Sequence, residues 1–230
     1  MSSDNDNDIK NDKENNDNTN NDTNNDINTN DNENVIIEVE ELKIPGLYYV
    51  NDIKEEAAEN IITELDKFEW VPLTNSANSR LVQHYGYKYD YKTYNIKNKC
   101  DDIPECLMML KNLLTDICLE MDIINEDYVF NQCIVNNYLP GQGISRHTDV
   151  KKYGGVIGCF TLGGGATMTF KNNDHEDEHL YVAPNSVYIM SKDARYLWTH
   201  EMISKKIDIV DNIKTKRERR ISVTFRNVPC

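Results

Sequence analysis

The chain of 230 residues has little positive charge, no paired-cysteine motif and no long apolar run. Its 25 Lys and Arg stand against 39 Asp and Glu, for a net charge of −14, which argues against broad, sequence-independent binding of nucleic acid. No apolar stretch opens the chain or is long enough to span a bilayer, so neither secretion nor membrane insertion is expected. The six cysteines show no C-x-x-C spacing, which favours a cytoplasmic or nuclear compartment.

The first 34 residues lack large apolar side chains apart from Met1, Ile9 and Ile27 and consist mainly of Asn and Asp. Such a tract cannot offset the entropy lost on ordering, so residues 1–34 are predicted to be a disordered leader. The leader carries a net charge of −8, which leaves −6 for residues 35–230. This remaining length is enough for one domain with a hydrophobic core.

Apolar periodicity predicts an α+β domain. Helical spacing runs from Lys54 to Phe68 and again from about Pro104 to Met121. Strands are expected at residues 35–39, 46–50, 130–139, 156–162, 166–170, 180–183, 186–190 and 220–227, and only strands after Tyr128. Two helices ahead of many short strands indicate a sandwich or roll with both helices packed on one face.

Histidines are scarce, and two side chains form an H-x-D triplet. His147 and Asp149 stand two residues apart, so in an extended chain they point to the same side and can bind one ion. Such triplets are common by chance, and a metal site needs a third ligand. Two His and one carboxylate on one face of an octahedron is the arrangement of non-haem iron(II) oxygenases, which leaves positions for a co-substrate and oxygen.

The third ligand must come from His84, His175, His179 or His200. His175 and His179 lie in a polar segment, for which a solvent-exposed loop is the better explanation. His200 follows the apolar segment Tyr196–Trp198, so its imidazole is expected beside buried surface. A hydrogen-bonded core histidine is the alternative at that position.

Residues 220–226 alternate strictly. Ile221, Val223 and Phe225 share one face, and Arg220, Ser222, Thr224 and Arg226 share the other. The two arginines lie about 20 Å apart along an extended strand, and their guanidinium groups could close on the two ends of a short dicarboxylate. The alternative is an exposed edge strand whose charges deter aggregation.

Three segments together carry a resemblance to a known family. Asn136–Asp149 resembles the AlkB pattern N-x-Y-x-P-G-x-x-I-x-x-H-x-D, Arg195–His200 is similar to the distal-histidine motif, and residues 220–226 match the closing R-x(5)-R. The resemblance to AlkB-type Fe(II)/2-oxoglutarate-dependent dioxygenases spans about residues 42–228. With His84–Tyr91, these segments are also similar to the AlkB-like domain of the branch that hydroxylates a modified wobble uridine of transfer RNA.

The resemblance implies a fold and a site. The fold is a double-stranded β-helix, or jelly roll, with two buttressing helices in the N-terminal half, formed by residues 35–230. It implies that His147, Asp149 and His200 are the ligands of Fe(2+) and that catalysis depends on them. Residues implied to bind 2-oxoglutarate are Asn136, Tyr138, Arg220, Ser222 and Arg226. Arg220 would pair with the distal carboxylate and Arg226 with the oxo-acid end, and the order of the two is left open.

Four tyrosines fall where the family has its nucleotide-recognition lid: Tyr85, Tyr87, Tyr89 and Tyr91. Strand alternation would place them on one face, suited to stacking on a base, and an ordinary aromatic sheet face is the alternative. The resemblance implies oxidation of an alkylated or modified nucleobase with O2, by demethylation or hydroxylation, giving succinate and CO2.

RNA, transfer RNA in particular, is favoured over DNA as the substrate. A monomer is expected, with a methyltransferase as a separate partner. Two alternatives stay open: the same chemistry on a protein side chain or small molecule, which the acidic charge favours, and a non-catalytic binding module.

Overall fold

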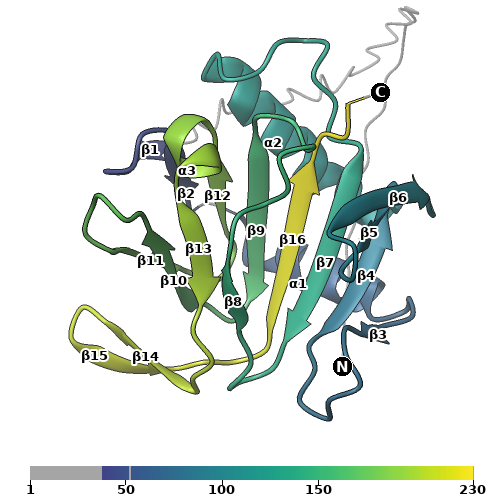
Figure 1. Ribbon diagram of the computed structural model, residues 1–230. Coiled ribbons are helices and arrows are strands. Elements are labelled where there is room, and N and C mark those ends of the chain that lie inside the picture. Colours follow the sequence, from purple (N-terminus) through teal and green to yellow (C-terminus); the bar gives the residue numbers. More distant parts are fainter. Residues whose placement is uncertain (1–37, 52, 230) are drawn as a thin grey trace, which may run out of the picture. The chain divides into compact units, whose positions relative to one another are not determined.

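The computed structural model describes residues 38–51 and 53–229, all within the compact unit of residues 37–230 (Figure 1). The predicted leader and most of the predicted strand at 35–39 lie outside the described residues. The helices are α1 (Glu55–Leu65), the 3-10 helix η1 (Glu105–Leu107), α2 (Met108–Glu120) and α3 (Lys192–Tyr196). The strands are β1 (Glu40–Glu41), β2 (Leu47–Val50), β3 (Val71–Pro72), β4 (Leu81–Tyr85), β5 (Tyr87–Asp90), β6 (Asn95–Lys99), β7 (Gln132–Tyr138), β8 (Ile144–His147), β9 (Ile157–Gly163), β10 (Ala166–Lys171), β11 (Glu178–Val182), β12 (Ser186–Met190), β13 (Thr199–Met202), β14 (Ile207–Val210), β15 (Ile213–Lys216) and β16 (Arg220–Arg226).

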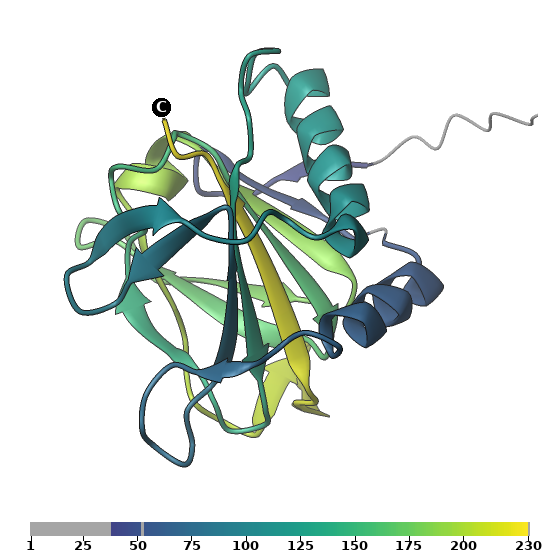
Figure 2. The same cartoon turned by 90° about the vertical axis from the view of Figure 1, so that its right-hand side faces the viewer.

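Two antiparallel sheets form a double-stranded β-helix, as predicted. The large sheet has the order β1-β2-β12-β9-β16-β7-β4-β3, and the smaller one has the order β11-β10-β13-β8 (Figure 1). Strands β5 and β6 form a separate hairpin, as do β14 and β15. Both long helices lie on the same side of the large sheet (Figure 2), so the predicted α+β architecture is confirmed.

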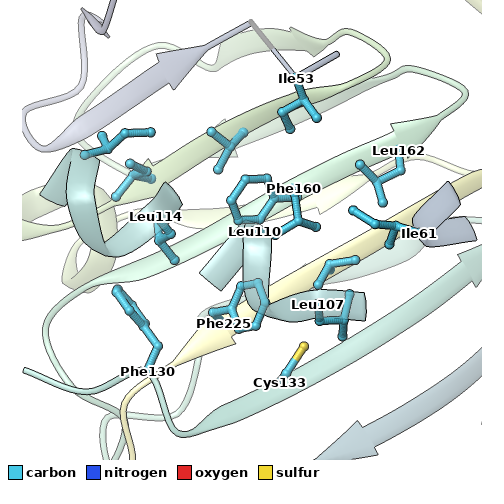
Figure 3. Packing of buried hydrophobic residues seen from close by; sticks show 14 of the residues in the cluster. Ile53, Ile61, Leu107, Leu110, Leu114, Phe130, Cys133, Phe160, Leu162 and Phe225 are labelled. Atoms are coloured by element: carbon cyan, nitrogen blue, oxygen red, sulfur yellow. The ribbon is translucent and has the colours of Figure 1, made fainter. Parts of the chain in front are cut away.

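One hydrophobic core joins the helices to the large sheet. Leu110 and Leu114 of α2 are fully buried against Phe160 and Phe225, whose rings meet edge to face with centroids 5.9 Å apart (Figure 3). Gly158 permits this close approach, because a Cβ there would lie 2.4 Å from Leu114 Cδ1. Burial of each such side chain contributes about 1.5–3 kcal/mol.

The opposite face of β16 points into the roll. Its alternating polar set, Arg220, Ser222, Thr224 and Arg226, is buried there. All seven residues of β16 pair with β7 on one side and with β9 on the other. The predicted alternation is therefore confirmed, and the alternative of an exposed edge strand is wrong, because β16 lies in the interior of the sheet.

The expectation of strands alone after Tyr128 is wrong at α3. This five-residue helix is too short for a periodic signal, and tertiary contacts stabilise it: the Ala194 amide donates to the Pro45 carbonyl at 3.1 Å. Strands β3 to β6, β8 and β13 to β15 were not expected as separate elements either. In the part of the chain that is described, no helix is long and apolar enough to cross a membrane.

Candidate active site

Neighbouring strands of the small sheet bring the predicted metal ligands together. Strands β8 and β13 lie side by side (Figure 1). His147 at the end of β8 is the cross-strand partner of His200 in β13, with ring centroids 4.4 Å apart. Asp149 follows β8, and its Oδ2 lies 3.6 Å from His200 Nε2. One ligand atom from each side chain lies within 4.8 Å of the others, so the three could hold one metal ion on a single face.

Hydrogen bonds orient two of these side chains. His147 Nδ1 lies 2.8 Å from the Ser145 carbonyl oxygen, so Nδ1 carries the hydrogen that is donated and Nε2 keeps its lone pair for a metal. Asp149 Oδ1 accepts from Arg226 Nε at 2.7 Å. The second carboxylate oxygen of Asp149 is thereby left to face His200.

Burial and charge set the protonation of the triad. Burial, reinforced by the neighbouring His147, lowers the pKa of His200 to about 3, so its imidazole is neutral and able to bind a metal. Burial alone would raise the pKa of Asp149, but the Arg226 guanidinium, helped by the neighbouring His200 and His147 side chains, holds it below its ordinary value. The site thus presents a neutral His200 imidazole and an ionised Asp149 carboxylate at neutral pH.

Arg195 fixes the loop that carries Asp149. Its side chain, 2% exposed, donates from Nη1 to the Asp149 carbonyl at 3.0 Å and from Nη2 to the Val150 carbonyl at 2.7 Å. The sequence marked Arg195 only as the first residue of a motif and gave no sign of this role. Helix α3 is the element that brings the guanidinium to the loop.

An inner chamber between the two sheets contains all five residues predicted to bind 2-oxoglutarate: Asn136, Tyr138, Arg220, Ser222 and Arg226. Arg220 donates from Nη2 to Thr161 Oγ1 at 2.9 Å, but its buried Nε has no hydrogen-bond partner among the described residues. An unpaired buried donor costs about 1–3 kcal/mol. A carboxylate in this chamber would satisfy it, so the donor set fits a dicarboxylate.

Three of the other residues predicted to bind 2-oxoglutarate already have partners. Arg226 is paired with Asp149, and Asn136 Oδ1 accepts from Arg80 Nε at 2.9 Å. The Ser222 hydroxyl lies 3.2 Å from Cys159 Sγ. Sequence alternation placed Arg226 on the correct face but did not show that its guanidinium reaches the metal-binding carboxylate.

An outer chamber of about 530 Å³ opens above the triad. Its walls include Arg80, Tyr89, Tyr91, Tyr94, Arg146 and Tyr153, with His147, Asp149 and Arg226 at the junction with the inner chamber. The volume suits one small-molecule-sized group. Sequence reasoning missed Arg80 and Tyr153, because neither belongs to a periodic or spaced pattern.

The predicted shared face of the four tyrosines is wrong. Gly86 has φ +75°, and a Cβ there would lie 1.9 Å from the Asn131 carbonyl oxygen, so the chain turns between β4 and β5. Tyr85 is 6% exposed and packs in the helix-side core, and Tyr87 lines a different pocket. Tyr89 and Tyr91 line the outer chamber.

Residues 214–220 contain five basic side chains, of which the three arginines are paired with carboxylates or point inward. Arg217 is 7% exposed and forms an ion pair with buried Asp208, and Arg219 pairs with Asp66. Arg220 points into the roll. The two histidines predicted to be solvent-exposed, His175 and His179, are exposed.

Comparisons with known proteins agree with this geometry. The model of the 2OG-Fe(II) oxygenase superfamily matches residues 50–226. The uncharacterized protein L905 of Acanthamoeba polyphaga mimivirus is 33% identical over 80% of this chain and 85% of its own length. The tRNA (carboxymethyluridine(34)-5-O)-methyltransferase alkbh8 of Xenopus tropicalis is 31% identical over 81% of this chain, which spans 32% of that relative.

A third relative and a solved structure point the same way. The alkylated DNA repair protein ALKBH8 homolog of Arabidopsis thaliana is 31% identical over 83% of this chain and 61% of its own length. The solved structure of OsALKBH1 superposes with a TM-score of 0.57 at 14% identity, over 83% of this chain and 100% of that chain.

The matched family model covers more than half of the chain, so the protein belongs to the 2OG-Fe(II) oxygenase superfamily. Within it, the relatives and the fold define an AlkB-type dioxygenase. The cofactor and co-substrates of this enzyme are Fe(2+), 2-oxoglutarate and O2.

Proposed function

We propose that this enzyme hydroxylates or oxidatively demethylates an alkylated or modified nucleobase, with RNA favoured over DNA. The observation that carries the proposal is the position of the triad at the junction of two chambers. The inner chamber holds an unpaired buried guanidinium donor, and the outer one is lined by tyrosines. The first suits a dicarboxylate and the second a flat ring.

Different residues of the protein bind the metal, bind 2-oxoglutarate and position the ligands. His147, Asp149 and His200 hold the iron, and Arg220 binds the distal carboxylate of 2-oxoglutarate beside Thr161. Tyr138 and Ser222 complete the wall of that site. Arg226 fixes Asp149, and Asn136 and Arg226 border both chambers. With iron bound, 2-oxoglutarate and O2 supply the oxidant for a substrate C–H bond and leave as succinate and CO2.

Two considerations support a nucleobase as the substrate. The printed names of the frog and Arabidopsis relatives refer to a transfer RNA uridine and to alkylated DNA. A base in a single-stranded RNA loop reaches such a chamber without the cost of flipping it out of a duplex. The net charge of −14 favours the alternative, a protein side chain or a small molecule.

Nucleoside mass spectrometry tests the proposal. Protein loaded with iron(II) and 2-oxoglutarate is incubated in air with RNA and DNA oligonucleotides that carry single modified bases, with Asp149→Ala as the inactive control. Loss of a methyl group or gain of one oxygen on a base, with an equal amount of succinate, is expected for the wild type. Succinate formation that responds only to peptides or free metabolites would contradict a nucleobase substrate.

Three further statements stay predictions: a monomeric state, a separate methyltransferase partner and a cytoplasmic or nuclear location. The chain spans about a third of the frog relative, so the activities of that whole protein are not carried over. The assignment of residues 1–34 as a disordered leader and of 35–230 as the catalytic domain is a proposal of the same kind.

A further inference from the structure

His84 in β4 contacts two residues of the outer chamber, although it lies apart from the triad. The Tyr89 amide donates to His84 Nδ1 at 3.4 Å, and the Tyr91 hydroxyl lies 3.3 Å from His84 Nε2. The His84 and Tyr91 rings meet edge to face with centroids 5.6 Å apart. The histidine therefore links β4 to the segment that carries the chamber tyrosines.

These contacts fix which nitrogen of His84 carries the hydrogen. An amide can only donate, so Nδ1 must be the acceptor of the Tyr89 N–H. A neutral imidazole then has its hydrogen on Nε2. Burial lowers the pKa of His84 to about 4, so the ring is neutral at physiological pH. Nε2 consequently donates to the Tyr91 oxygen.

The hydrogen bond from His84 determines whether the Tyr91 hydroxyl can donate its own hydrogen. Since its oxygen accepts from His84, the hydroxyl hydrogen is free to donate elsewhere, and no other partner for it occurs in the described residues. Burial raises the pKa of Tyr91, so the phenol stays protonated. Tyr89 packs against the ring edge to face at 4.9 Å and limits its rotation.

We propose that Tyr91 donates a hydrogen bond to an acceptor atom of the substrate ring in the outer chamber, and that His84 is the positioning residue that leaves this donor free. The inference rests on the proposed function, because it takes the outer chamber as the place of the nucleobase. A second donor lies nearby. Arg80 lines the same chamber, and among the described residues its two terminal nitrogens have no hydrogen-bond partner. With these two donors, the outer chamber favours a substrate ring whose edge carries hydrogen-bond acceptors.

The test separates positioning from a merely structural role. The variants are Tyr91→Phe, His84→Leu, the double variant and His84→Gln, whose amide can still donate from about the Nε2 position. Tyr87→Phe is the matched control, because it removes a hydroxyl from the same hairpin at a residue that lines a different pocket. Each protein is loaded with iron(II) and 2-oxoglutarate without oxygen.

Two quantities are measured for each variant. Fluorescence anisotropy gives the dissociation constant of a labelled RNA stem-loop with a uridine-containing loop, and the visible absorbance of the iron–2-oxoglutarate complex reports the inner chamber. Loss of one neutral hydrogen bond, about 0.5–1.5 kcal/mol, corresponds to about 2- to 12-fold weaker binding. We expect this loss for Tyr91→Phe and His84→Leu, no further loss in the double variant, near wild-type binding for His84→Gln and Tyr87→Phe, and unchanged absorbance throughout.

Other outcomes overturn the inference in distinguishable ways. Equal RNA affinity of Tyr91→Phe and wild type would show that Tyr91 does not donate a hydrogen bond to the substrate. The proposed function would not be affected. Additive losses in the double variant would show that His84 does not act through Tyr91. If wild type forms the iron–2-oxoglutarate complex but binds neither the stem-loop nor any of the RNA and DNA oligonucleotides that carry modified bases, the nucleobase proposal fails and this inference fails with it.

Discussion

The inner and outer chambers share the metal triad but differ in how their walls are built. One wall of the inner chamber comes from β7, β16 and β9, in which the central strand β16 pairs with each neighbour along its whole length, and the polar residues of this wall are buried. The outer chamber also has sheet residues in its wall, but its tyrosine side comes from the β5–β6 hairpin and the adjoining segments, where Tyr94 is 73% exposed. The contrast shows that the metal and 2-oxoglutarate sites are built on the rigid sheet, whereas binding of the substrate depends on segments with fewer packing partners.

The largest expected effect is at the residues that both chambers share. His147→Ala or Asp149→Ala removes one of three protein ligands, so iron binding and succinate formation should fall below detection while the fold persists. Iron content and single-turnover succinate assays measure this.

His175→Ala and His179→Ala are the controls, since both side chains are exposed away from the triad. They should leave turnover near normal. Iron retained at wild-type stoichiometry in Asp149→Ala would rule out the triad.

Arg220 tests the inner chamber alone. Arg220→Lys keeps the charge but loses the two-pronged contact with a carboxylate. A charge-assisted hydrogen bond contributes about 1.5–3 kcal/mol, so the 2-oxoglutarate requirement should rise about ten- to a hundredfold, with iron binding unchanged. Titration of 2-oxoglutarate against succinate formation measures the effect.

Arg219→Lys is the matched control one residue away. Its side chain is paired with Asp66 at the surface, where an ion pair contributes little. Equal effects of Lys at both positions would show that the side-chain register of β16 is wrong.

His84 gives the outer region an acid sensitivity. Its pKa falls from an ordinary value of about 6.5 to about 4 in the folded protein. The unfolded chain therefore binds the proton more readily, and stability should fall as pH drops from about 6.5 towards 4, by up to about 2 kcal/mol after allowance for solvent screening. Urea unfolding at pH 7 and pH 5 should show a smaller difference for His84→Gln than for wild type; an identical difference would contradict the shifted pKa.

The smallest expected effect concerns Tyr153, whose buried hydroxyl has no hydrogen-bond partner within residues 38–51 and 53–229. Removal of an unsatisfied buried hydroxyl should raise stability, so Tyr153→Phe should stabilise the substrate-free protein by about 1 kcal/mol. If the Tyr153 hydroxyl forms a hydrogen bond with the bound substrate, Tyr153→Phe should bind the substrate a few-fold more weakly. Thermal melts and RNA titrations measure both; a lower melting temperature would show that the hydroxyl already has a partner.

Short-range patterns in the sequence determined the inner chamber. The spacing of His147 and Asp149 and the alternation of residues 220–226 fix which side chains share a face, because the two-residue period of a strand is a local property. The order of two helices and many strands likewise gave the fold class.

Only the tertiary structure decided how distant segments meet. The pairing of β8 with β13 brings His200, to which the sequence resemblance had pointed, beside His147, and the fold brought Arg195 and Arg226 to the segment around Asp149. The turn at Gly86 separated Tyr85 from Tyr89 and Tyr91, since its left-handed backbone is required by the Asn131 carbonyl, a contact between residues far apart in the chain. Local periodicity carries no information on contacts between residues far apart in the chain, and such contacts form the outer chamber.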